Sequence, residues 1–186
     1  MMGVMAHLPS AELEHHLDHL RVAPADAGTL GLLVRRPGPR TREVLVEGFL
    51  DIEGGLVGDN WLTRGSRSMS DGSADPEAQV TVMSHRMVSV LSDDPEVQAL
   101  AGDQLYVDLD LSVTNLPAGT RLGVGGAVLE VSAKPHTGCA KFIDRFGFDV
   151  VRFVNGGVGR ELRLRGLNAR VLTGGIVHVG DLIHKL

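Results

Sequence analysis

The chain has 186 residues, of which 43% are hydrophobic, 22% are charged and 4% are aromatic. This composition is typical of a globular domain whose core consists of Val, Leu, Ile and Ala, and no apolar run approaches the roughly 18 residues of a membrane span. The net charge of −5 and the scarcity of aromatic side chains argue against nucleic-acid binding.

The first predicted element is a short helix over residues 10–20. Three leucines at helical spacing give it an apolar face, Ser10 can cap its start, and Pro24 ends it. We expect residues 1–28 to form a helical extension and residues 29–186 to form the main domain.

Most of the remaining elements are predicted to be short strands. Apolar and polar residues alternate at period two in several of them, and Gly125-Gly126 supplies the positive φ angles of a two-residue hairpin turn. The predicted strand regions are 29–36, 42–52, 78–83, 104–113, 120–132, 159–172 and 175–186.

Helices and loops separate these strands. We expect a glycine-rich connection at 54–61, an exposed loop at 64–78, a helix at 84–91 capped by Ser84, a short helix at 94–102 and a helix at 139–154. Many short strands without a strand–helix alternation predict a mainly β fold, namely a closed or nearly closed β-barrel with a few short helices.

Charge is unevenly distributed along the sequence. Residues 1–133 carry a net charge of −10, whereas residues 134–170 carry eight Lys and Arg against three Asp and Glu, a net of +5. Such a basic segment attracts an anionic ligand, or its arginines simply solvate the outer faces of strands and helices.

Cys139 is the only cysteine, so it forms no internal disulfide and needs a reducing compartment to stay free. The start of the chain lacks a secretory signal, so we expect a cytoplasmic protein. Turn residues precede Cys139 and a helical pattern follows, which places it near a helix N-terminus beside Lys134, His136 and Lys141. This setting favours a thiolate that acts as nucleophile, persulfide carrier or soft metal ligand, rather than a buried small hydrophobe.

Four stretches together resemble the MOSC domain family, named for the C-terminal domain of molybdenum-cofactor sulfurases. They are "GGLVGDNW" (54–61), the central region 101–132, "HTGCAKFIDRFG" (136–147) and the closing region 159–181. The resemblance implies a barrel like the β-barrel domain of pyruvate kinase. It also implies a cysteine that ligates molybdenum of the pterin cofactor or carries sulfur as a persulfide. Some relatives reduce N-hydroxylated compounds with electrons from partner proteins.

Carried over to this sequence, the resemblance implies that Cys139 is the molybdenum ligand and that Cys139 and His136 are catalytic. The predicted contacts to the molybdopterin-type cofactor are Lys134, Thr137, Lys141, Arg145, Arg152, Arg160, Arg163, Arg165, Asn168 and Asp59. Arginines suit the cofactor phosphate because their guanidinium groups bind it in a bidentate manner.

The predicted partners are a small-molecule substrate and an electron-donor or sulfur-donor protein, with neither nucleic acid nor membrane. Thr137 and Gly138 fill positions where many family members have Arg or Pro, so a guanidinium is missing there. The chain also lacks the pyridoxal-dependent domain of the sulfurases, so another protein would have to load any carried sulfur. Two alternatives stay open: a sulfur carrier without metal, and a non-catalytic module that binds an anionic ligand.

Overall fold

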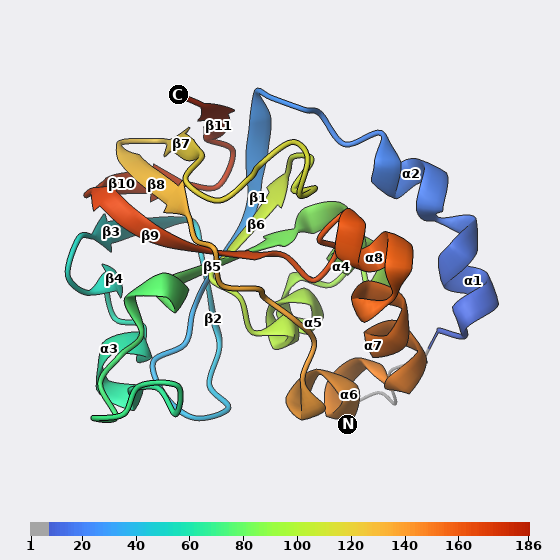
Figure 1. Cartoon of the computed structure of the whole chain (residues 1–186), viewed down its shortest axis with the longest axis horizontal. Coiled ribbons are helices and arrows are strands. Elements are labelled where there is room, and N and C mark those ends of the chain that lie inside the picture. The colour runs from blue at the N-terminus through green and yellow to red at the C-terminus, as the bar shows by residue number, and fades with distance from the viewer. Residues whose placement is uncertain (1–7) are drawn as a thin grey trace.

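The computed structural model describes residues 8–186, so the first seven residues of the predicted extension 1–28 lie outside it. Seven strands form a closed barrel in the order β11-β7-β8-β9-β5-β6-β1, and pairing of β1 with β11 closes the ring (Figure 1). All neighbours are antiparallel except β5 and β6. The barrel strands are β1 (Gly28–Arg35), β5 (Val80–Ser84), β6 (Leu105–Asp108), β7 (Arg121–Val124), β8 (Ala127–Val131), β9 (Leu167–Thr173) and β11 (Leu182–Lys185). The predicted closed barrel is confirmed.

Four further strands lie outside the ring. Strand β2 (Glu43–Leu45) extends the sheet beside β1, and β10 (Gly175–His178), β3 (Glu47–Asp51) and β4 (Gly55–Leu56) form a separate antiparallel sheet. The predicted strand 42–52 is therefore divided between two sheets.

Helices hold about as many residues as strands do. They are α1 (Ser10–His15), α2 (Leu17–Arg21), α3 (Trp61–Arg64), α4 (His85–Leu91), α5 (Pro95–Gln98), α6 (Ala140–Phe146), α7 (Phe148–Asn155) and α8 (Gly157–Glu161), with 3-10 turns η1 (Pro76–Ala78) and η2 (Ala99–Ala101). Most of them cover one side of the barrel, to the right in Figure 1. None of the helices within residues 8–186 has the length and apolar character of a membrane span.

The apolar core has two parts, which β1 shows clearly. Leu30 and Leu33 point into the barrel, whereas Leu32 and Val34 pack with the helices outside it. A register shift between Leu30 and Leu32 changes the phase of the alternation, so that these two residues point to opposite faces, and both faces of the strand are buried. The strand therefore anchors the helices, including α6 and α7, to the barrel wall.

Local capping agrees with the sequence at one helix and differs at another. The Ser84 side chain accepts a hydrogen bond from the backbone N–H of Met87 and caps α4, as predicted. Ser10 does not cap α1, because Pro9 is the N-cap residue and Ser10 is already helical. The predicted helix at 10–20 is two short helices.

Two predicted strand regions were partly wrong. Strand β6 ends at Asp108 instead of continuing to residue 113 because a turn follows, in which the Asp110 side chain accepts a hydrogen bond from the backbone N–H of Ser112. Of region 159–172, only the β9 part is a strand; its first half is α8 and a turn. Arg163 has φ +47° and Gly166 has φ +103°, angles that a strand does not allow.

Candidate functional site

A cavity of about 410 Å³ lies between the loop after β8, the end of α7, and the turn that joins α8 to β9. This volume is in the range of small-molecule sites. The residues that line it are Val113, Ser132, Ala133, Lys134, Pro135, His136, Thr137, Val154, Asn155, Gly159, Arg160, Arg163, Arg165, Gly166 and Leu167.

The charged side chains that line this cavity are all cationic. Lys134 forms an ion pair with Asp75, and Arg165 with Asp103, whereas Arg160 and Arg163 have no acidic partner within residues 8–186. Burial lowers the pKa of Arg163, but an arginine stays protonated in proteins. The cavity therefore suits an anion.

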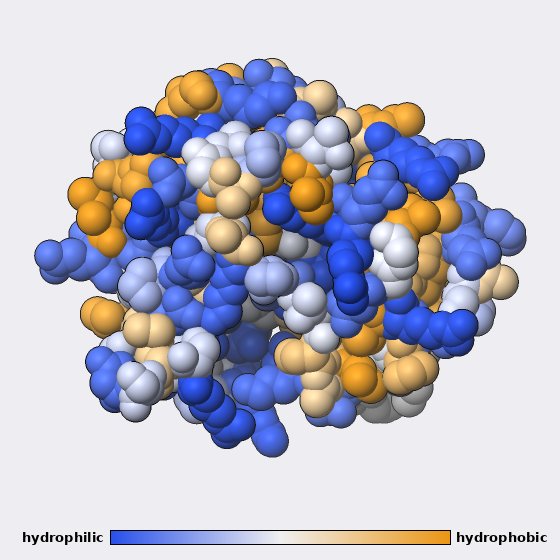
Figure 2. Space-filling model, viewed as in Figure 1, coloured by the Kyte–Doolittle hydropathy of each residue, from blue (hydrophilic) through white to orange (hydrophobic). Residues whose placement is uncertain are grey.

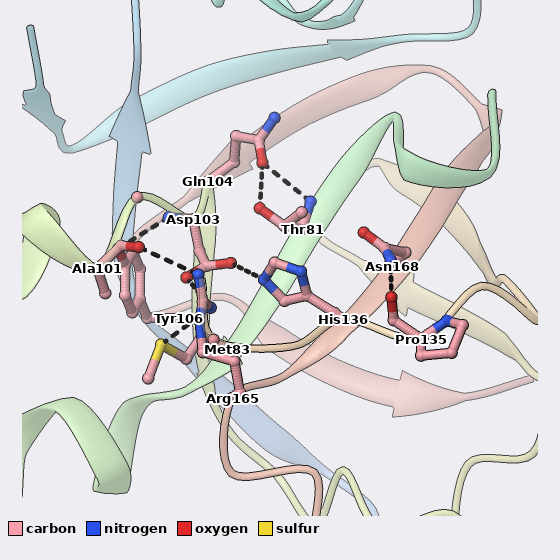
Figure 3. A network of polar contacts seen from close by, with 12 residues as sticks. Thr81, Met83, Ala101, Asp103, Gln104, Tyr106, Pro135, His136, Arg165 and Asn168 are labelled. Carbon is pink, nitrogen blue, oxygen red and sulfur yellow. Dashed lines mark hydrogen bonds and ion pairs between the residues drawn. The ribbon is translucent and has the colours of Figure 1, made fainter. Parts of the chain in front are cut away.

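A buried polar network forms one wall of the cavity (Figure 3). Nε2 of His136 lies 2.6 Å from Oδ1 of Asp103, and Nη1 of Arg165 lies 2.5 Å from Oδ2 of the same carboxylate. Nη2 of Arg165 donates to the Ala101 carbonyl at 3.1 Å, and its guanidinium lies 4.7 Å from the centre of the Phe142 ring. Nε of Arg165 is buried without a hydrogen-bond partner among the described residues.

The network sets the protonation of its members. Burial would raise the pKa of Asp103, but the charges of Arg165 and His136 and the hydrogen bond from His136 outweigh it and lower that pKa to about 2. Burial, together with the charge of Arg165, lowers the pKa of His136, although Asp103 opposes the change. His136 is therefore neutral near pH 7. We infer that its proton is on Nε2, facing the carboxylate, so that Nδ1 keeps a free lone pair.

We expect the free energy of unfolding to fall as the pH drops below about 6.5, the pKa of an unfolded histidine. The pKa of His136 is lower in the folded state, so the unfolded state binds more protons below this pH. The contribution of His136 to the free energy of unfolding is therefore complete only above about pH 6.5. The free energy of unfolding can be measured with urea near pH 7.5, 6.5 and 5.5. It should change more steeply with pH for the wild type than for His136→Gln, by up to about 1.4 kcal/mol per pH unit.

His85, whose pKa burial also lowers, contributes equally to both proteins and cancels in this comparison. Equal slopes would contradict the assignment of a lowered pKa to His136. The lowered pKa of Asp103 acts in a separate window, since its contribution is present above about pH 4 and is lost as the pH falls toward 2.

Two asparagines hold the loop that carries Lys134 and His136. Nδ2 of Asn168 donates to the Lys134 and Pro135 carbonyls, at 3.1 and 3.2 Å (Figure 3 shows the second contact). Asn155 forms two hydrogen bonds with the backbone of Gly138, at 2.9 and 3.1 Å. Loop residues 134–138 are thus fixed at both ends by side chains from β9 and α7.

Cys139 is the N-cap residue of α6, as the sequence predicted, and its side chain is exposed. It follows directly after the fixed loop but does not line the cavity. Its carbonyl accepts the backbone N–H groups of Phe142 and Ile143. The thiol is therefore open to solvent two residues after Thr137, which lines the cavity, and is not a buried apolar group.

The structure brings six of the predicted site residues together around the cavity: Lys134, His136, Thr137, Arg160, Arg163 and Arg165. Asn168 is buried behind them. Lys141 is exposed on α6, Arg152 is exposed on α7 beside α1, and Arg145 donates to the Leu100 carbonyl. The Asp59 side chain is fully buried and accepts hydrogen bonds from Nε and Nη2 of Arg36, at 2.8 and 2.9 Å.

Sequence reasoning missed Asp103, Asp75 and Asn155, which hold His136, Lys134 and Gly138. Asp103 and His136 are 33 residues apart, and Asp75 and Lys134 are 59 apart. Among 23 acidic residues, no local pattern distinguishes these two. Only the fold makes them neighbours of the basic segment.

No family model matches the sequence, and no curated protein matches it either. Solved structures do match. YuaD from Bacillus subtilis superposes with a TM-score of 0.63 at 17% identity, over 84% of this chain and 94% of YuaD. YiiM from Geobacillus stearothermophilus superposes with a TM-score of 0.59 at 14% identity, over 86% of this chain and 75% of that protein. YiiM from Escherichia coli superposes with a TM-score of 0.55 at 19% identity, over 85% of this chain and 69% of that protein. YuaD and YiiM are MOSC-domain proteins.

The chain has the MOSC fold. The resemblance inferred from the sequence is thereby confirmed at the level of the fold. Within this fold, the loop that leaves β8 passes the cavity before it enters α6, where Cys139 is the N-cap residue.

Proposed function

We propose that this MOSC-fold chain binds a molybdenum–pterin cofactor, with Cys139 as the protein ligand of the metal, and acts as a small oxidoreductase. The observation that carries the proposal is a cavity with a wholly cationic charged lining, which includes Thr137, two residues before the only thiol of the chain. A phosphate-bearing cofactor needs such a lining, and a thiolate is a soft ligand that suits a sulfur-bound metal.

The residues present fit this group. Arg160 and Arg163 have charges that no acidic residue of the described chain balances, and Nε of Arg165 is a buried donor without a partner. These three arginines would hold the phosphate and neighbouring polar atoms of the cofactor, and Cys139 would hold the metal. When bound, the cofactor supplies the redox chemistry.

The proton chemistry falls to His136. It lines the cavity and is held neutral by burial, with Asp103 fixing the orientation of its ring. The reaction class that we propose is reduction of N-hydroxylated compounds, in which two electrons from a partner protein and two protons from solvent convert an N–OH group to N–H and water. The free Nδ1 of His136 can take a proton from water in the cavity and deliver it to the hydroxyl oxygen that leaves.

Replacing Cys139 with serine should abolish molybdenum content without unfolding the protein. Cys139 is exposed, and serine is a better N-cap residue than cysteine, so the start of α6 is preserved. Elemental analysis of wild type and Cys139→Ser, both purified from a cofactor-producing host, measures this. Asp144→Ala, which removes an exposed side chain of α6 that is not a predicted cofactor contact, is the control and should keep its metal. Retention of molybdenum by Cys139→Ser would refute the ligand assignment.

The exposure of Cys139 favours a second candidate function, that of a sulfur carrier. A thiol outside the cavity is accessible to another protein, as exchange of a persulfide requires. If neither wild type nor Cys139→Ser contains molybdenum, the intact mass decides: an added sulfur atom on Cys139 of the wild type supports the carrier.

A further inference from the structure

The outer face of the separate sheet carries a row of exposed apolar side chains. Leu50 of β3 is buried in the barrel core, whereas the neighbouring Phe49 points to the opposite face and is 44% exposed. Ile176 of β10 pairs directly with Phe49 and is 49% exposed. On the other side, the backbone N–H of Val57 donates to the Phe49 carbonyl, and Val57 is 53% exposed. Directly paired residues share a face of a sheet, so these three side chains are neighbours. We call them the Phe49 row.

The inner face of this sheet is fixed to the barrel. Leu50, Leu56 and Val177 belong to the core inside the ring, and a Cβ on Gly48 would lie 2.9 Å from Cδ1 of Leu56. The Phe49 row therefore lies on a rigid support. Figure 2 shows hydrophobic residues gathered on the left of the molecule, over the region where Figure 1 places β3 and β10. Single exposed apolar residues are common on proteins, but a contiguous group is typical of an interaction surface.

Carboxylates lie at both ends of this face of β3. Glu47 and Asp51 are each two residues from Phe49, so all three side chains point to the same side of the strand. Glu47 contacts His178, its cross-strand neighbour, at 2.8 Å, and the Asp51 carboxylate accepts two backbone N–H groups of the turn that follows. Among residues 8–186, no Lys or Arg nitrogen lies within 4 Å of either carboxylate.

The two segments that form this sheet contain no Lys or Arg. Segment 43–59 has five acidic residues and segment 171–183 has one. A second copy on the same face would bring like charges together, and the phosphates of nucleic acid or of an anionic membrane would be repelled. The face therefore suits a partner that combines apolar and cationic side chains.

We propose that the Phe49 row is a docking site for a protein segment in which an apolar residue has Lys or Arg two residues before and two residues after it. In an extended segment these three side chains share one face and lie roughly 7 Å apart, the same spacing as Glu47, Phe49 and Asp51 in β3. The apolar residue would pack on the Phe49 row, and each cation would face a carboxylate. The proposal does not rest on the function proposed for the cavity.

Selection of random peptides displayed on phage tests the chemistry of this face. With the wild type as bait, we expect enrichment of peptides that have an apolar residue flanked at two residues by Lys or Arg. The same selection with Phe49→Ser should not enrich them. Phe49 is partly exposed and its neighbours in β3 hold the sheet, so the variant should stay folded, which thermal unfolding checks.

Binding of the most enriched peptide, labelled with a fluorophore, gives the size of the effect. Fluorescence anisotropy should show at least about tenfold weaker binding to Phe49→Ser, because the apolar anchor is lost. Glu47→Lys should weaken it to a similar extent, and added salt should weaken binding to the wild type. Phe148→Ser is the matched control: Phe148 is 65% exposed on α7, and this variant should bind within about twofold of the wild type.

Three results would each overturn the proposal. The first is a selection with the wild type that enriches no such peptide, and the second is equal binding by Phe49→Ser. The third comes from sedimentation velocity. If the wild type forms a dimer as its concentration rises and Phe49→Ser does not, a second copy of the chain covers this face instead.

Discussion

Replacing Asp103 with alanine is expected to lower the free energy of unfolding by about 3–5 kcal/mol, measured by urea denaturation near pH 7. Asp103 is fully buried and accepts from both Arg165 and His136. Its removal leaves the Arg165 guanidinium buried without a counter-charge. An arginine cannot avoid this cost by losing its proton.

Two further variants isolate the cause. Arg170→Ala breaks an exposed ion pair with Glu130 and should cost less than about 1 kcal/mol. The double variant Asp103→Ala/Arg165→Met should be more stable than Asp103→Ala alone, because it removes the stranded charge as well. If Asp103→Ala costs no more than Arg170→Ala, the buried ion pair has no structural importance.

Gly166→Ala is expected to destabilise the protein by roughly 4 kcal/mol, since backbone strain and steric overlap act together. Gly166 has φ +103°, and a Cβ there would lie 2.1 Å from the Val82 carbonyl oxygen in β5. Neither strand can shift easily, because β5 and β9 pair directly and continue the closed ring. Thermal and urea unfolding measure the loss.

Gly157→Ala is the matched control. Gly157 begins α8, and nothing lies within 4 Å of the position of its Cβ. Alanine favours helix over glycine, so this variant should be unchanged or up to about 1 kcal/mol more stable. A Gly166→Ala variant as stable as Gly157→Ala would show that the α8–β9 turn can change its backbone conformation.

Local patterns predicted most of the barrel. The hairpin around Gly125-Gly126 and the Ser84 cap depend on neighbouring residues, and both are found. Region 159–166 shows the limit of such patterns. Leu162 and Leu164 alternate with arginines as in a strand, yet both leucines pack against the helices outside the barrel, because Arg163 turns the chain with a positive φ.

The cationic lining of the candidate site was predictable from the concentration of Lys and Arg in residues 134–170. The basic segment that begins at Lys134 contributes all the cations that line the cavity. The sequence of this segment does not indicate which of its arginines form ion pairs with carboxylates. Arg165 pairs with an aspartate 62 residues earlier, whereas Arg163 donates to backbone carbonyls. Such contacts depend on the topology of the barrel, so local sequence patterns cannot predict them.

Closure of the barrel also limits how another protein can bind to it. The ring itself has no unpaired strand edge, so a partner could add a strand only at β2 or at the separate sheet of β10, β3 and β4. Cys139 lies off the ring, at the start of α6, among side chains of the basic segment. If a donor protein serves this thiol, as we propose, we expect it to recognise the charged surface of helix and loop around Cys139. Its association should be fast at low ionic strength and should slow as added salt screens the attraction.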